Sequence, residues 1–93
     1  MELSFEWDQR KAEANLIKHG ASFKEAITIF GDILSVTRSD PDHSQTEARY
    51  ITMGMSIRHR ILVVVHADRG DKVRLISARP ATRAEQRNYE KTN

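Results

Sequence analysis

The longest apolar run in this sequence, Ile61–Val65, constrains the fold most strongly. It is followed by a polar break containing Gly70, which can take the positive φ of a tight turn, and by a second apolar-rich run that ends at Arg79. Two such runs around a glycine-containing turn predict an antiparallel hairpin. Because Pro80 cannot donate a backbone hydrogen bond, the second strand is expected to stop there. Both faces of Ile61–Val65 are apolar, so this strand is predicted to be central in a sheet.

Two helices are predicted near the start of the chain. The first runs from Gln9 to about His19, with Asp8 as its N-cap. The second begins at a capping box formed by Ser22 and Glu25. Their predicted apolar stripes consist of Ala12, Leu16 and the stem of His19 in the first helix and of Phe23, Ala26, Ile27 and Phe30 in the second.

A third helix is predicted at the end of the chain. Thr82 and Glu85 have the spacing of a capping box, and the helix is expected over residues 83 to about 91. It offers only Ala84 and Tyr89 to a core, which predicts weak docking. Apolar sheet surface is therefore expected to stay uncovered by the chain, where a partner could cover it.

Three further strands complete the predicted sheet. Residues 3–7 alternate apolar and polar side chains, Ile33–Thr37 is a short strand, and residues 48–56 form a longer one. The polar stretch Arg38–Gln45 is the predicted loop. The order of elements predicts one small α+β domain over residues 1–93, with a mainly antiparallel sheet of about five strands, two N-terminal helices and one C-terminal helix.

The composition limits the class of protein. The chain of 93 residues contains no cysteine, which excludes disulfides and cysteine-ligated zinc. The N-terminal stretch shows no export signal, and the longest apolar run is far too short to span a bilayer. We therefore expect a cytoplasmic protein without a membrane role.

Charge is distributed unevenly along the chain. Residues 1–48 carry five Lys/Arg and nine Asp/Glu, a net charge of −4, whereas residues 49–93 carry ten and four, a net charge of +6. A basic half suggests a polyanionic partner. An ordinary solvated surface explains the same distribution, so charge alone leaves both interpretations open.

Metal-dependent and nucleophilic chemistry receive little support from the sequence. The four histidines show no HxH or HExxH spacing, and a solvated turn explains Asp40–His43 better than a cation site does. There is no cysteine nucleophile, no GxSxG motif and no phosphate-binding glycine loop. No cofactor or metal is therefore expected.

The arginines around the start of the last helix fit RNA cleavage. Without a metal, the 2′-hydroxyl attacks the adjacent phosphate, and the protein must supply a base, an acid and cations for the charge on the phosphorane. Arg79 ends the last strand, and Arg83 and Arg87 share a helix face by their i, i+4 spacing. Because a guanidinium fork binds a phosphate bidentately, Arg79 and Arg83 are the predicted phosphate and transition-state contacts.

Other polar residues are candidates for positioning or proton transfer. These are Lys18, His19, His43, Glu47, Arg49 and Tyr89. Each also has a structural explanation; His19, for example, suits a helix C-terminus through its charge. A binding-only module for single-stranded nucleic acid is the rival hypothesis. Such modules stack bases on exposed strand aromatics, and only Tyr50 could serve here.

Several runs of the sequence resemble the BrnT family of toxins. They are Phe5-Glu6-Trp7-Asp8, Lys11 with Asn15, Lys18-His19-Gly20, Phe23-Lys24-Glu25-Ala26, His43-Ser44 with Glu47 and Arg49, and Ile76-Ser77-Ala78-Arg79 with Ala81, Glu85 and Tyr89. The resemblance extends in order over nearly the whole chain. One departure is Gly31-Asp32-Ile33, where the family often has Asp-Pro, and it should affect only a turn.

The resemblance implies a ribonuclease toxin of a type II toxin–antitoxin system with a RelE-like fold. It also implies a partner, a BrnA-type antitoxin with a ribbon-helix-helix part, which neutralises the toxin and through which the complex binds its operator DNA. The leading hypothesis is thus a metal-independent endoribonuclease that cleaves RNA and inhibits translation. The alternative is a non-catalytic subunit that binds a partner or nucleic acid.

Overall fold

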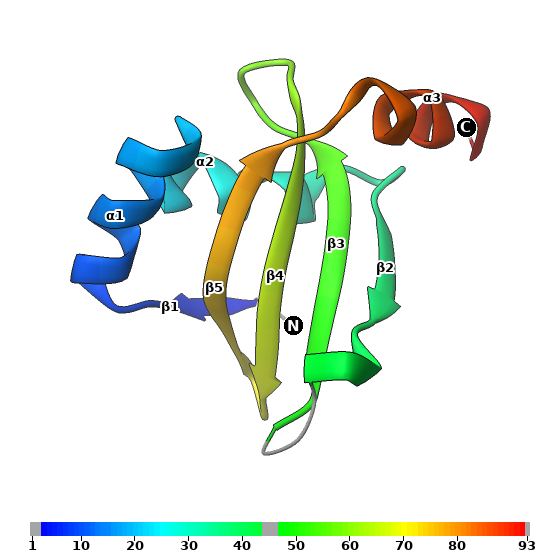
Figure 1. The fold of residues 1–93 in the computed structure, drawn as a ribbon. Helices are drawn as coiled ribbons and strands as arrows, with labels where there is room; N and C mark the ends of the chain where they lie inside the picture. Colours follow the sequence, from blue (N-terminus) through cyan, green and yellow to red (C-terminus); the bar gives the residue numbers. More distant parts are fainter. Residues whose placement is uncertain (1–2, 44–46, 93) are drawn as a thin grey trace.

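The computed structural model describes residues 3–43 and 47–92, except for the side chains of His43 and Thr92. It contains a five-stranded sheet with α1 along one edge, α2 behind it and α3 across one end (Figure 1). In chain order the elements are β1 (Ser4–Glu6), α1 (Gln9–His19), α2 (Phe23–Ala26), the 3₁₀ helix η1 (Ile27–Gly31), β2 (Val36–Ser39), the 3₁₀ helix η2 (Pro41–His43), β3 (Arg49–Met55), β4 (Ile61–Arg69), β5 (Lys72–Pro80) and α3 (Arg83–Thr92).

The sheet has the strand order β1-β5-β4-β3-β2. Strands β2 to β5 pair antiparallel with their neighbours, whereas β1 runs parallel to β5 with Ser4 opposite Lys72. The predicted hairpin is β4–β5, and Gly70 takes a φ of 62° in its turn. β4 is central, as its apolar sequence predicts. The α+β class with about five mainly antiparallel strands is therefore confirmed.

α1 lies along the outer edge of β5 (Figure 1). Its predicted N-cap is confirmed, because the Asp8 carboxylate accepts hydrogen bonds from two backbone N–H groups of the first turn. The predicted apolar stripe is only partly correct: Ala12 packs against the core, but Leu16 is exposed, and the buried residue of α1 is the polar Asn15. The Asn15 side chain donates to the Ala78 carbonyl (2.8 Å) and accepts from the Ala78 N–H (3.1 Å). It thus takes the place of a neighbouring strand at this point of β5.

The second predicted helix is shorter than expected. The Ser22 hydroxyl accepts from the Glu25 N–H (3.0 Å), but the Glu25 carboxylate binds Arg60 and does not complete the capping box. After Ala26 the chain tightens into η1, with three residues per turn. This change of phase turns Ile29 fully into the core, which α-helical spacing did not predict.

The strand predicted at Ile33–Thr37 begins three residues later. The Asp32 carboxylate accepts from the Leu34 N–H (2.9 Å), and the Asp32 carbonyl accepts from the Ser35 N–H (3.0 Å). These bonds fold the chain into a turn, so β2 occupies Val36–Ser39 and takes the first part of the predicted loop.

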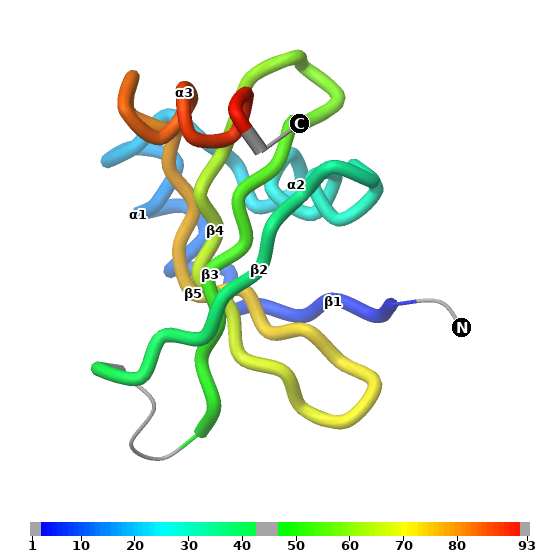
Figure 2. Tube along the Cα trace, turned by 90° about the vertical axis from the view of Figure 1, so that its right-hand side faces the viewer, coloured from blue at the N-terminus to red at the C-terminus, as the bar shows by residue number. Residues whose placement is uncertain are grey.

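Apolar clusters lie on both faces of the sheet. The larger one, between the sheet and the α1–η1 segment, includes Phe23, Ile29, Leu62, Val64 and Leu75. The smaller one, beneath α3, contains Ile61, Val63, Ala81 and Tyr89. In Figure 2, α2 lies on one side of the sheet and α3 on the other. None of the helices in the described part of the chain has the length and apolar character needed to span a membrane.

Candidate nucleic-acid interface

Four arginines line the sheet face that carries α3 and lies opposite α2, here called the open face. They are Arg38, Arg49, Arg74 and Arg79. Residues paired across strands point to the same side of a sheet. Arg79 pairs with Val63 and Arg38 with Ile51, which belong to or pack on the cluster beneath α3. Arg49 and Arg74 both pair with Ala67, which alternation along β4 puts on the same side as Val63. No described helix crosses the middle of this face (Figure 1).

A β-bulge brings Arg74 and Arg79 to the same face. They are five positions apart, so a regular strand would point them to opposite sides. The register shifts by one residue of β5, Ile76, between the Val65–Ser77 pair and the next pair. The bulge therefore adds Arg74 to the open face.

The floor between the arginines is apolar. Towards α3 it deepens into a groove of about 250 Å³, lined by Val36, Arg38, Ile51, Met53, Val63, Glu85 and Asn88. No aromatic ring lines this groove. Tyr50 pairs with His66 on the opposite face, where the two rings stack 5.9 Å apart. A base-stacking platform on Tyr50 is therefore not part of the open face.

Arg79 is held by Glu85 of α3. Arg79 Nη1 donates to Glu85 Oε1 (2.7 Å) and Nη2 to Oε2 (2.9 Å). The hydrogen bond from Arg79 outweighs burial and lowers the pKa of Glu85 to about 2, and the same bond raises the pKa of Arg79. Both groups are thus charged at neutral pH. The Arg79 side chain still keeps 40% of its surface exposed.

Arg83 and Arg87 lie on another side of α3. Each is two positions from Glu85, which is a rotation of about 200° around an α-helix. Both are exposed, and neither forms an ion pair with a carboxylate of the described residues. Arg79 and Arg83 therefore lie at the same end of the sheet but on different sides of the helix.

Tyr89 anchors α3 to the sheet. Its side chain is buried in the smaller cluster, and its hydroxyl donates to the Asp32 carboxylate. Burial, together with this bond, raises the pKa of Tyr89 to about 12. Burial alone would raise the pKa of Asp32, but hydrogen bonds from two backbone N–H groups and from Tyr89 lower it overall. The phenol is thus neutral and engaged, and its part in proton transfer stays a prediction.

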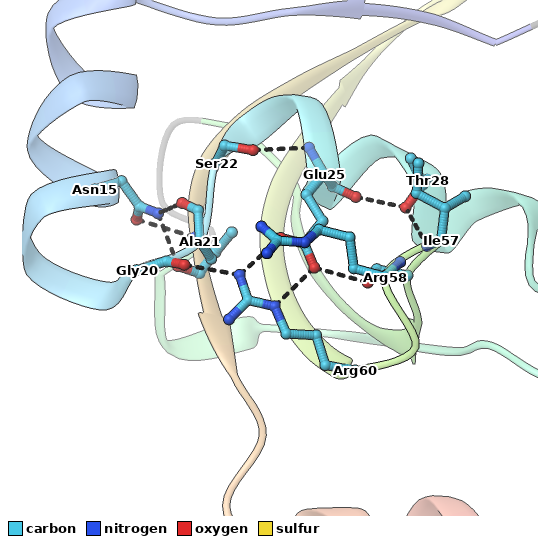
Figure 3. Close-up of polar contacts among 11 residues, drawn as sticks. Asn15, Gly20, Ala21, Ser22, Glu25, Thr28, Ile57, Arg58 and Arg60 are labelled. Atoms are coloured by element: carbon cyan, nitrogen blue, oxygen red, sulfur yellow. Dashed lines mark hydrogen bonds and ion pairs between the residues drawn. The ribbon is translucent and has the colours of Figure 1, made fainter.

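Lys18 and His19 end α1 at the β5 edge of the sheet, beside a buried ion pair. The next residue, Gly20, accepts a hydrogen bond from Arg60 Nη2 through its carbonyl (2.7 Å). Arg60 also binds both carboxylate oxygens of Glu25, which is 5% exposed (Figure 3). The hydrogen bond from Arg60 outweighs burial and lowers the pKa of Glu25. This network fastens the β3–β4 turn to the corner between α1 and α2.

The remaining predicted residues lie at the other end of the sheet. The β4 positions paired with Arg49 and Arg79 are four residues apart, which corresponds to ~13 Å along the strand. The Glu47 carboxylate accepts from Arg69 Nε (3.1 Å). His43 ends η2, and its side chain lies outside the described residues. The predicted site residues are thus spread over three places, and their roles stay predictions.

Sequence reasoning missed Arg38 and Arg74 on the open face. Arg38 was placed in a loop because the turn after Asp32 delays β2, and the signal for that turn was the Gly31-Asp32 pair. The face on which Arg74 lies could not be predicted, because it depends on the bulge and the sequence gives no signal for that bulge. Within residues 3–43 and 47–92, no three His, Asp or Glu side chains are grouped so as to hold a metal ion.

Known proteins share this sequence pattern and fold. Residues 7–85 match the family described as "Ribonuclease toxin, BrnT, of type II toxin-antitoxin system". The fold is similar to the crystal structure of the Brucella abortus ribonuclease toxin, BrnT, with a TM-score of 0.64 and 21% sequence identity over 88% of this chain and 100% of that one. No curated protein sequence matches the chain. Because the family match covers well over half of the sequence, the chain belongs to the BrnT family of ribonuclease toxins of type II toxin–antitoxin systems.

Proposed function

We propose that this chain is a metal-independent endoribonuclease toxin that acts in the cytoplasm as one domain of 93 residues. The observation that carries the proposal is the row of four arginines on a sheet face whose middle no described helix crosses. Phosphates along an RNA strand can contact these guanidinium groups while riboses and bases lie on the apolar floor. The description of the family supports ribonuclease activity, and its location on this face is our proposal.

Arg79 is the proposed contact of the scissile phosphate, and Arg83, which lies on another side of α3, is proposed to contact the RNA chain beside it. The 2′-oxygen attacks the phosphorus, the bond to the 5′-oxygen breaks, and the products are a 2′,3′-cyclic phosphate and a 5′-hydroxyl. A base takes the 2′-hydroxyl proton, an acid protonates the 5′-oxygen, and Arg79 stabilises the phosphorane charge. The candidates for positioning and proton transfer are Lys18, His19, His43, Glu47, Arg49 and Tyr89.

Membership of a type II system implies a protein antitoxin as partner. We infer that it is of the BrnA type, with a ribbon-helix-helix part that contacts operator DNA on behalf of the complex. The open face is basic and its groove is apolar, so an antitoxin segment with acidic and apolar residues would complement it. Such a segment would exclude RNA and so neutralise the toxin.

The test is RNA cleavage by the purified chain in the presence of EDTA. We expect cleavage to persist, to stop when the nucleotide at the cut carries no 2′-hydroxyl, and to fall about 100-fold or more in Arg79→Ala. Expression without antitoxin should arrest growth. RNA left intact by the folded wild type would support the non-catalytic alternative, and loss of cleavage with EDTA would indicate a metal-dependent nuclease.

A further inference from the structure

The Arg79–Glu85 pair leaves one edge of the Arg79 guanidinium available. A guanidinium carries five N–H donors in one plane. Nη1 donates to Glu85 Oε1 (2.7 Å) and to the Pro80 carbonyl (3.3 Å), and Nη2 donates to Glu85 Oε2 (2.9 Å). The two donors that remain, Nε–H and the second Nη2–H, point in the same direction and form a fork. None of the described residues accepts from this fork.

Glu85 is itself fixed by the start of α3. Its Oε1 accepts from the Thr82 N–H (2.9 Å), and its own N–H donates to the Thr82 hydroxyl (3.2 Å), which completes a capping box. All three hydrogen bonds to its carboxylate therefore come from the backbone or from a planar guanidinium. α3 is also anchored by Tyr89, so the Arg79–Glu85 pair is not the sole contact that holds the helix on the sheet.

We propose that Glu85 is a positioning residue for RNA cleavage: its carboxylate holds the Arg79 guanidinium so that the Nε–Nη2 fork faces the scissile phosphate on the open face. This inference rests on the proposed function. It assigns Glu85 no contact with RNA and no proton transfer. A cation that is already held in place loses no side-chain freedom when the phosphorane forms.

A purely electrostatic role for Glu85 would have the opposite effect. A carboxylate beside Arg79 weakens the attraction between that arginine and a phosphate, so its neutralisation would favour RNA binding and cleavage. In Glu85→Gln, the side-chain amide N–H group faces the Nη2 donor of Arg79. The pair of hydrogen bonds between residue 85 and the guanidinium is therefore broken. Positioning therefore predicts a lower kcat with unchanged or tighter RNA binding.

The decisive measurement is single-stranded RNA cleavage by the free toxin, purified away from its antitoxin. Glu85→Gln should lower kcat about tenfold or more, because misplacement of a transition-state group is costly, while KM does not rise. Thr82→Ala is the matched control, since it removes the other half of the capping box and leaves Arg79 and Glu85 in contact. Its kcat should stay close to that of the wild type, and Glu85→Asp, which keeps the charge, should rescue part of the loss.

A double mutant separates positioning from structure. If Glu85 acts only through Arg79, the Arg79→Ala/Glu85→Gln protein should cleave no more slowly than Arg79→Ala. Nitrogen-15 NMR of the arginine side chains gives a readout without RNA. The two Nη signals of Arg79 should be resolved in the wild type, where the hydrogen bonds to Glu85 slow rotation of the guanidinium group. They should merge in Glu85→Gln.

Two results would overturn the inference while RNA cleavage stands. One is an unchanged kcat in folded Glu85→Gln. The other is a Glu85→Gln substitution that lowers kcat by the same factor in the wild type and in the Arg79→Ala protein. A wild type that fails to cleave RNA would refute the proposed function itself. In that case the NMR comparison still decides whether Glu85 immobilises Arg79.

Discussion

At the scale of single residues, buried polar side chains determine how the helices meet the sheet. Asn15 donates to the carbonyls of Ala21 and Ala78 and accepts from the Ala78 N–H. It therefore satisfies backbone groups that the short strand β1 does not reach. The same amide fixes the residue next to Arg79, so a helix residue determines the geometry of a strand end.

We expect Asn15→Leu to lower the free energy of unfolding by about 3 kcal/mol or more, since each buried backbone group left without a partner costs ~1–3 kcal/mol. Urea denaturation followed by circular dichroism measures the change. Glu13→Leu, at an exposed position of the same helix, is the control and should change stability by less than ~0.5 kcal/mol. Equal midpoints for the two variants would contradict the role of Asn15.

Glu25 is expected to make stability depend on pH. Its pKa in the folded protein lies below the unfolded value of 4.5, first because of the hydrogen bond from Arg60. The stabilisation is therefore complete above that value and is lost as the pH falls through the folded pKa. Glu25→Gln should cost about 2–3 kcal/mol at neutral pH, at or below the usual cost of breaking a buried ion pair because Arg60 is partly exposed.

Chemical denaturation at neutral pH and in mild acid tests this prediction. The stability difference between wild type and Glu25→Gln should shrink on acidification. The pKa of Glu85 shifts in the same direction, so its contribution is also complete above the unfolded value and is lost as the pH falls towards its folded pKa of about 2. A difference that is constant with pH would show that the Glu25 charge does not stabilise the fold.

The sequence predicted caps better than it predicted burial. Asp8 and the Thr82–Glu85 box were predicted because capping depends on neighbours within three positions, and the structure confirms both. The burial of Asn15 could not be predicted, because its partners include a residue 63 positions away. The Arg79–Glu85 contact joins residues only six positions apart, but it crosses the junction between β5 and α3, so the sequence showed Glu85 only as part of a capping box.

At the scale of elements, two short irregular segments make the fold differ from the one that residue spacing predicts. η1 changes the helical phase and buries Ile29, and the turn at Asp32 delays β2. Both segments lie against Gly54 of β3, where an added Cβ would lie 3.2 Å from that of Ile29 in η1 and 3.0 Å from that of Ser35 in the turn. Neither segment has the apolar periodicity of an α-helix or a strand, so neither could be predicted from periodicity alone.

α3 is expected to be held mainly by the Tyr89 ring. Tyr89→Ala should destabilise the protein by about 3–4 kcal/mol, as for other large buried aromatics. Tyr89→Phe should cost only about 1 kcal/mol, because Asp32 keeps two backbone donors. Thermal unfolding distinguishes the two, with Glu90→Ala, at an exposed position of the same helix, as the control. Similar losses in both Tyr89 variants would mean that the hydroxyl dominates.

At the scale of the whole molecule, the two faces of the sheet have different tasks. One is covered by α2 and η1 and carries the larger core, and the other carries the arginines of the open face. The charge asymmetry of the sequence left a polyanionic partner and an ordinary solvated surface both open. The positions of Arg49, Arg74 and Arg79 on one face follow from strand register and the bulge, which only the structure shows.

RNA binding is expected to weaken with salt in proportion to the arginines it uses. For a single-stranded RNA that lacks the 2′-hydroxyl at the cut, Arg38→Gln and Arg74→Gln should each reduce the slope of log affinity against log salt by ~0.7. Fluorescence anisotropy at several salt concentrations measures the slope. Lys24→Gln, exposed on α2 behind the sheet, should leave it unchanged. If Lys24→Gln reduced the slope as much as Arg38→Gln and Arg74→Gln do, the RNA would not be bound specifically on the open face.

The parallel pairing of β1 with β5 also has a consequence for how the toxin is made. Residues 4–6 pair with residues 72–74, so β1 can join the sheet only after β5, the last of the described strands, has been synthesised. Arg79 lies towards the end of β5, and α3 comes later still. We therefore expect a partly synthesised chain to lack the assembled open face.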